Sequence, residues 1–291
     1  LDAIGEHALI EQVVISKRIY IIAEDYSRKS EPLASGLAIS LLQDAVEQLI
    51  WCIVKQIDLG VKDTEGFVSL LTKIEQKYGE PVPQKAKMLE LNKARVGFKH
   101  YGNLPASSEA EKFRLYAHDF LVLASQRYLD ISFDDVSLAL LIGDKKIRGY
   151  VQASQEALAR DEIEHAVSEA ALGRFFMFKK LDAYLPKVDR RLRDADRIFE
   201  QIPGMKGRGV RVFQYLTDYL GGVARFNAAA LAGGDIGEHL YFERALPSVL
   251  EFIGGKTQVN FGRATQPSRE LAERAIKYVI ETTVRIENTV Q

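Results

Sequence analysis

Arg95 and His100 are the residues whose types and spacing best suit chemistry, because four residues separate them within a basic segment. Between residues 85 and 100 there are five Lys or Arg and one acid, in a chain whose formal net charge is −1. A guanidinium is a permanently charged fork donor for phosphate oxygens, and an imidazole titrates near neutral pH and can move a proton. The pair therefore predicts chemistry on a phosphodiester.

The geometry of a helix limits how this pair can act. On a regular helix two residues five apart point about 140° away from each other, which is poor geometry for both to touch one phosphate within a single chain. Two chains packed about a two-fold axis would let the Arg95 of one meet the His100 of the other, and Gly97 could loosen the helix between them. The alternative interpretation is a solvated basic helix end, where cations are favourable beside the last carbonyls.

The Arg-x4-His spacing, with the helix order expected for roughly the first 130 residues, resembles the HEPN superfamily (higher eukaryotes and prokaryotes nucleotide-binding). This resemblance implies an all-helical bundle and a metal-independent ribonuclease in which two motifs face each other in a dimer. It also implies a role as a microbial toxin or as an effector in defence against phage. Family nucleases usually carry a polar residue directly after the Arg, whereas this chain has Val96.

The resemblance assigns Arg95 and His100 as the catalytic residues. His100 would take the proton of the RNA 2′-hydroxyl or protonate the leaving 5′-oxygen, and Arg95 would stabilise charge on the phosphoryl oxygens. Lys93 and Lys99 would hold flanking phosphates, and Tyr101 could stack on a base. The products would be a 2′,3′-cyclic phosphate and a 5′-hydroxyl end, with no metal and no cofactor.

A competing hypothesis is a non-catalytic HEPN-like scaffold or nucleotide-binding interaction protein. Val96, the nearly neutral net charge and a repeat-like helical hairpin after Asp144 favour it. A third hypothesis is a subunit of a larger complex whose activity resides elsewhere. Incubation with labelled RNA in EDTA separates the first hypothesis from the second.

Composition indicates an ordinary folded protein, with 47% hydrophobic and 27% charged residues in 291. That length favours two domains, which we place at residues 1–130 and 131–291. The longest apolar run, residues 49–54, is far shorter than the roughly 18 residues of a membrane span, so we expect no membrane helix. We also expect no secretory signal. The single cysteine, Cys52, cannot form an intrachain disulfide, and a reducing cytoplasm is the simplest location.

Hydrophobic periodicity predicts an all-α fold. In the first part we expect helices over residues 6–28, 33–58, 67–78 and 85–101, with Leu89 and Val96 on the buried side of the last. Ser108 and Glu111 predict a capping box that opens a fifth helix. Short connections between these helices imply an antiparallel bundle.

For the second part we expect a helical hairpin over residues 144–158 and 162–185, then helices over 192–202, 210–231 and 268–290. Residues 257–261 could be extended, but one segment makes no sheet. The spacing of Glu162 and His165 suits a di-metal site that needs two copies, and the chain has one, so we expect no metal. Residues 204–209, with Arg211, are best interpreted as a flexible basic turn. This part would serve a regulatory protein partner.

Overall fold

The computed structural model describes residues 3–62, 64–182, 219–223, 226–227, 230, 235–252, 254–262 and 266–290. The chain divides into two compact units, Leu1–Leu140 and Leu141–Gln291. The predicted all-α class is confirmed, because one two-stranded sheet is the only departure from helix among the regular elements described.

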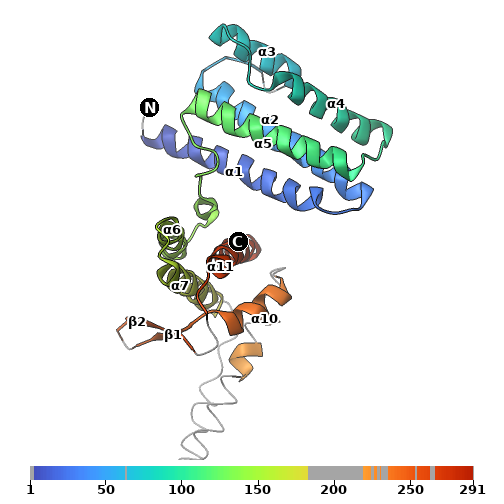
Figure 1. The fold of residues 1–291 in the computed structure, drawn as a ribbon. Helices are drawn as coiled ribbons and strands as arrows, with labels where there is room; N and C mark the ends of the chain where they lie inside the picture. The colour runs from blue at the N-terminus through green and yellow to red at the C-terminus, as the bar shows by residue number, and fades with distance from the viewer. Residues whose placement is uncertain are drawn as a thin grey trace, which may run out of the picture. The chain divides into compact units, whose positions relative to one another are not determined.

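Five helices form the first unit (Figure 1): α1 (Ala3–Ser27), α2 (Pro32–Gln56), α3 (Phe67–Tyr78), α4 (Lys85–Tyr101) and α5 (Ser107–Leu129). Helix α2 is central, because it packs against the other four. The segment over α1, rich in β-branched residues, is helical as expected, since α2 offers it an apolar helix face rather than a strand edge. The first unit is a helical bundle built around α2.

Helix α2 lies at the centre because two neighbouring rows of apolar residues line it. Leu42, Leu49 and Ile53 are fully buried, and Pro32 begins the helix at a position where a missing N–H costs nothing. By length and composition α2 could also cross a membrane, yet 67% of its most apolar stretch is buried inside the first unit. This burial is typical of the core helix of a soluble domain.

Two glycines set the boundaries around α4. Gly79 ends α3 and Gly102 ends α4, both with positive φ (72° and 66°), the conformation that glycine adopts at least cost. The buried side of α4 is made by Met88 and Leu91. Of the two residues expected on that side, Leu89 is partly buried and packs against the core, whereas Val96 is only partly buried.

The start of α5 differs from the prediction. The helix begins after Ala106, whose N–H donates to Glu109 Oε2 at 3.3 Å. Glu111, the residue expected to complete the capping box with Ser108, instead accepts two hydrogen bonds from Arg114. The predicted Ser108–Glu111 box is wrong because an ion pair within the next turn occupies the carboxylate.

The link after α5 packs on the first unit. Phe133 is 1% exposed and belongs to the core, and Lys17 Nζ donates to the carbonyls of Asp134 at 2.6 Å and Val136 at 2.8 Å. The first unit therefore continues past residue 130, where the sequence analysis placed the boundary, to Leu140. A short 3-10 helix, η1 (Leu138–Leu141), follows the link.

The second unit begins with the predicted hairpin. Helices α6 (Lys145–Ala159) and α7 (Ile163–Asp182) pack against each other, and Asp144 caps α6 by accepting from the N–H groups of residues 146 and 147. Helix α11 (Arg269–Val290) packs on both. The predicted helices over 192–202 and part of 210–231, and the basic turn at 204–209, lie outside the described residues.

Two features of the second unit were not predicted. Helix α10 (Ile236–Ala245) packs on α11, and strands β1 (Ser248–Glu251) and β2 (Thr257–Asn260) form an antiparallel pair in which Val249 faces Val259. The statement that residues 257–261 make no sheet is therefore wrong. The partner strand was missed because residues 248–251 show no alternation of apolar and polar residues.

Candidate functional site

Arg95 lies on α4 with its guanidinium partly enclosed. Its side chain is 25% exposed, and Nη2 lies 3.8 Å from Asp44 Oδ1 on α2, a long ion pair. Its Nε is buried and has no hydrogen-bond partner. A buried donor without an acceptor is uncommon in proteins, so this nitrogen is a polar group that the chain itself leaves unsatisfied.

The other predicted residues lie exposed along α4. Lys93, Lys99 and His100 are all exposed, and Tyr101 is 75% exposed. His100 stands in the last turn, where a cation interacts favourably with the terminal carbonyls. The structure therefore places two lysines, an imidazole and an aromatic ring within reach of solvent.

Arg95 and His100 do not meet within one chain. Among the contacts of the described residues no hydrogen bond or ion pair joins them. Helix α4 runs unbroken from Lys85 to Tyr101, so Gly97 does not loosen it, and the idea that this glycine unites the pair is wrong. A single chain presents the two groups on different sides of one helix.

The C-terminal half of α4 is fixed by its contact with α2. The ring of Phe98 lies over Gly36, where an added Cβ would sit 2.2 Å from Phe98 Cε2. Only glycine allows this approach of the ring to the backbone of α2. At the end of the helix the N–H of Gly102 donates to the carbonyl of Phe98 at 3.1 Å, and that of Asn103 to Gly97 at 3.1 Å. His100 and Tyr101 are thus held by a well-defined backbone.

Arg95 also borders an open hollow of about 490 Å³ between α2, α3 and α4. We call it the Arg95 hollow; its lining residues are Gln43, Glu47, Gly66, Phe67, Val68, Ser69, Asn92 and Arg95. These residues come from three segments distant in sequence. The sequence pattern indicates Arg95 but none of its neighbours in the hollow.

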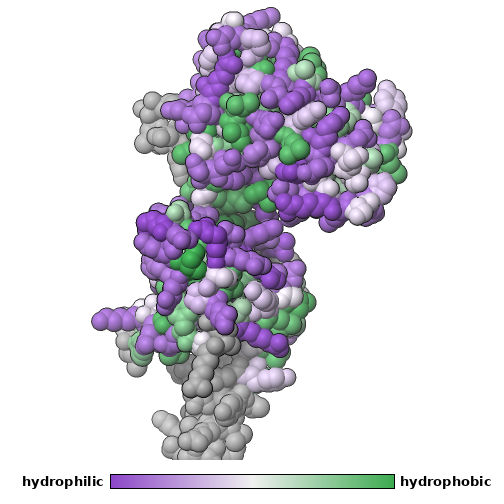
Figure 2. All heavy atoms as spheres, viewed as in Figure 1, coloured by the Kyte–Doolittle hydropathy of each residue, from purple (hydrophilic) through white to green (hydrophobic). Residues whose placement is uncertain are grey.

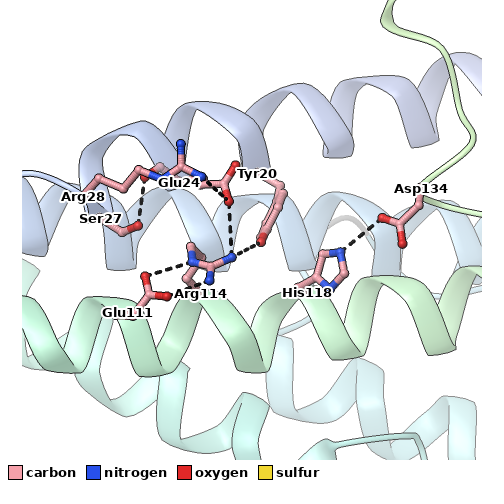
Figure 3. A network of polar contacts seen from close by, with 8 residues as sticks. All are labelled: Tyr20, Glu24, Ser27, Arg28, Glu111, Arg114, His118 and Asp134. Atoms are coloured by element: carbon pink, nitrogen blue, oxygen red, sulfur yellow. Dashed lines mark hydrogen bonds and ion pairs between the residues drawn. The ribbon is translucent and has the colours of Figure 1, made fainter. Parts of the chain in front are cut away.

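A second polar cluster joins α1 to α5 on another part of the first unit (Figure 3). Arg114 Nη1 lies 3.2 Å from both Tyr20 Oη and Glu24 Oε1, while Nε and Nη2 donate to Glu111 at 2.9 and 2.6 Å. The hydrogen bonds to Arg114 hold the pKa of Glu111 below its ordinary value, and burial raises the pKa of Tyr20. Because every group in this network has a partner, we interpret it as a structural contact that holds α1 and α5 together.

His118 extends this cluster toward the link. Its Nε2 lies 3.1 Å from Asp134 Oδ1, and its ring lies 5.6 Å from that of Tyr20 (Figure 3). Lys17 holds the same link from the other helix, and burial lowers the pKa of its amine. The His118–Asp134 pair therefore fastens residues 134–136 to the bundle.

On the face drawn in Figure 2, hydrophilic residues dominate the first unit and hydrophobic residues show as separate small patches. Exposed leucines do occur on α2, at Leu33 and Leu37, one helical turn apart on either side of Gly36. They border the position where Phe98 of α4 contacts α2.

No cluster suited to a metal ion is present in the described part of the chain. Within it no three His, Cys, Asp or Glu side chains lie close enough together to hold one. Of the predicted Glu-x-x-His pair, Glu162 bonds Arg160 at 3.0 Å and His165 lies 4.0 Å from Glu169. Glu162 thus lies in a local ion pair, and His165 lies beside a carboxylate of its own helix.

No family model, no curated protein and no solved structure matches this chain. The likeness to the HEPN superfamily therefore rests on the Arg95–His100 spacing and on the helix order of the first unit.

Proposed function

We propose that the first unit is a HEPN-like, metal-independent endoribonuclease whose active site forms between two copies of the chain. The observation that carries this proposal is that one continuous, basic helix carries an exposed His100 and an Arg95 whose Nε has no hydrogen-bond partner. The second unit would dock a regulatory protein, and a cytoplasmic toxin or defence effector is the role that fits such an enzyme.

The chemistry would use the RNA's own 2′-hydroxyl as nucleophile. The His100 imidazole removes the proton of that hydroxyl, and the oxygen attacks the adjacent phosphorus. The bond to the 5′-oxygen breaks as that oxygen takes a proton from solvent, and the imidazolium then returns its own proton to solvent. The Arg95 guanidinium stabilises the charge that develops on the phosphoryl oxygens. Lys93 and Lys99 bind neighbouring phosphates, so that cleavage weakens as salt rises, and Tyr101 stacks on a base.

A second copy of the chain would allow Arg95 and His100 to act on the same phosphate. Since Arg95 and His100 point to different sides of α4, a two-fold axis beside this helix brings the Arg95 of one chain toward the His100 of the other. The exposed Leu33 and Leu37, next to the Phe98 contact, offer apolar surface for such a pairing.

The experiment is cleavage of end-labelled RNA by the full chain in EDTA. We expect 2′,3′-cyclic phosphate ends from the native protein, and a loss of about 100-fold or more in His100→Ala, which lacks the proton-transfer group. Lys77→Ala, which removes an exposed cation from the last turn of α3, is the matched control and should cleave normally. Unchanged cleavage by His100→Ala would refute the proposal.

Mixing inactive variants tests whether the site is shared. In a heterodimer of Arg95→Ala with His100→Ala, one of the two sites keeps both native residues. An equal mixture should therefore regain about a quarter of native activity, because half of the dimers carry one intact site out of two. If heterodimers form but cleavage activity does not return, Arg95 and His100 do not act together in one shared site.

One observation favours the alternative of a non-catalytic interaction protein. Arg95 faces a hollow of its own chain and has Val96 beside it, where family nucleases carry a polar residue. Under this alternative the EDTA assay yields no cyclic phosphate, and partner capture depends on the second unit.

A further inference from the structure

We propose that the free edge of β1 binds an extended segment of a partner protein as a third strand, with one uncharged apolar side chain of that segment in a hollow between α7 and β1. This docking edge would serve the regulatory partner proposed above for the second unit, so it rests on that proposal and not on the cleavage of RNA by the first unit.

The edge of β1 that faces away from β2 has unpaired backbone groups. The last pair of the strands is Glu251 with Thr257, and one position further the N–H of Phe252 donates to the carbonyl of Lys256 at 2.8 Å. Hydrogen-bonded and non-hydrogen-bonded positions alternate along an antiparallel pair, so the N–H and C=O groups of Val249 and Glu251 point away from β2. No other described segment pairs with β1. Such an edge is a template for one more strand.

A hollow of about 490 Å³ lies beside this edge, between α7, the end of α10 and β1. We call it the α7–β1 hollow; its apolar lining residues are Phe175, Phe178, Phe242, Leu246, Pro247 and Val249. The strand residues that line it come from β1, and among the described residues of β2 none does. A residue opposite Val249 on an added strand would share the face of Val249, so its side chain would enter the hollow.

Ion pairs neutralise the charged groups of the α7–β1 hollow. Arg174 of α7 bonds Glu243 of α10 at 2.5 Å. Lys179, further along α7, bonds Glu251 of β1 at 2.5 Å. A charged side chain in the hollow would either break one of these pairs or lie unpaired among aromatic rings, and both are costly. The hollow therefore selects an uncharged apolar or aromatic side chain.

The opposite face of β1 favours a strand over a small apolar molecule. Leu250 and Phe252 alternate with the residues that face the hollow, and their side chains are 51% and 52% exposed. The strand pair lies beside α7 with this face uncovered by it (Figure 1). An added strand places side chains next to both faces of β1, whereas a molecule inside the hollow reaches only one. The expected segment is thus apolar on both faces.

The test is fluorescence anisotropy of a labelled short peptide, with a central phenylalanine flanked by valines and then threonines, titrated with the full chain. Replacement of its phenylalanine by aspartate should weaken binding about tenfold or more. Methylation of the phenylalanine nitrogen, whose N–H faces β1, should also weaken binding about tenfold or more. Methylation of the next valine nitrogen, whose N–H faces solvent, should change the affinity less than about threefold. The peptides leave the protein unchanged, so folding does not affect the comparison.

A matched pair of protein variants tests the same edge. Val249→Pro removes the outward N–H and keeps an apolar side chain, and proline is tolerated on an edge strand where its nitrogen faces solvent. Val249→Ala shortens the side chain and keeps the N–H. We expect Val249→Pro to bind the peptide about tenfold or more weakly than Val249→Ala does.

The outcomes separate this edge from the nuclease. Equal binding of the two methylated peptides, or no binding of the parent peptide, overturns the proposal. A smaller assembly of Val249→Pro than of Val249→Ala in sedimentation would assign the edge to a second copy of the chain and overturn it too. His100→Ala should bind the peptide as the native chain does, so loss of RNA cleavage alone refutes only the nuclease. Loss of peptide binding with intact RNA cleavage refutes only the docking edge.

Discussion

Substitution of Gly36 by alanine tests whether α4 is positioned by its contact with α2. The added Cβ would lie 2.2 Å from Cε2 and 2.4 Å from Cδ2 of Phe98. Favourable carbon contacts lie at about 3.5–4.0 Å, so the ring or the helix must move by more than about 1 Å. The buried backbone of α2 has little room to move, and the end of α4 that carries His100 would shift instead.

The free energy of unfolding should fall by about 1–2 kcal/mol in Gly36→Ala. Overpacking of this kind costs about 1–3 kcal/mol, and alanine in place of glycine inside a helix returns up to about 1 kcal/mol. Gly97→Ala is the matched control on α4, because its new Cβ meets nothing closer than Asn103 Nδ2 at 3.5 Å. That variant should be more stable than the native chain by up to about 1 kcal/mol.

The measurement is urea unfolding followed by tryptophan fluorescence. Trp51 is the one tryptophan and packs against the core of the first unit, so its emission reports this unit. The expected loss shifts the midpoint downward by about 0.5–1 M urea with an unchanged slope. Adding Phe98→Leu to Gly36→Ala should recover part of the loss. The reasoning fails if Gly36→Ala is as stable as the native chain or gains stability as Gly97→Ala does.

Two further predictions concern the first unit. Arg114→Met should lower the free energy of unfolding by about 1–2 kcal/mol, because the buried Tyr20 hydroxyl loses a partner and two carboxylates lose a cation. Arg28→Ala, at a side chain 66% exposed, should change that free energy by less than about 0.5 kcal/mol. Equal effects of the two substitutions would contradict a stabilising role for the Arg114 network. Burial raises the pKa of the Cys52 thiol to about 11. The native chain at pH 8 should therefore react with a thiol reagent far more slowly than the chain unfolded in urea. Equal reaction rates would show that Cys52 is accessible in the folded chain.

Helix positions in the first unit were predictable because the signals are local. Spacing of apolar residues, Pro32 before α2, and the glycines at 79 and 102 depend only on neighbouring residues. The predicted start of α5 was wrong because two local signals compete there. Ser108 and Glu111 have the spacing of a capping box, yet the helix begins after Ala106, because Glu111 pairs with Arg114 and Glu109 serves the cap.

The Arg95 hollow and the strand pair β1–β2 could not be predicted from the sequence, because they depend on contacts between distant segments. Gln43, Gly66 and Asn92 come from three helix segments, and no local pattern states that their side chains share one space. Likewise β1 becomes a strand only because β2 folds back on it. The prediction that Arg95 and His100 point apart needed only helical geometry. Their role stays a prediction, because it depends on a second chain.

The burial of Phe133 decides where this chain can be divided. Its ring belongs to the core of the first unit, 6.3 Å from that of Tyr20 on α1, and the following carbonyls hold Lys17. A fragment ending at residue 130 would leave an empty volume in its interior and a half-buried amine with no acceptor. Dissection of the two units should therefore retain residues 131–136 with the N-terminal piece.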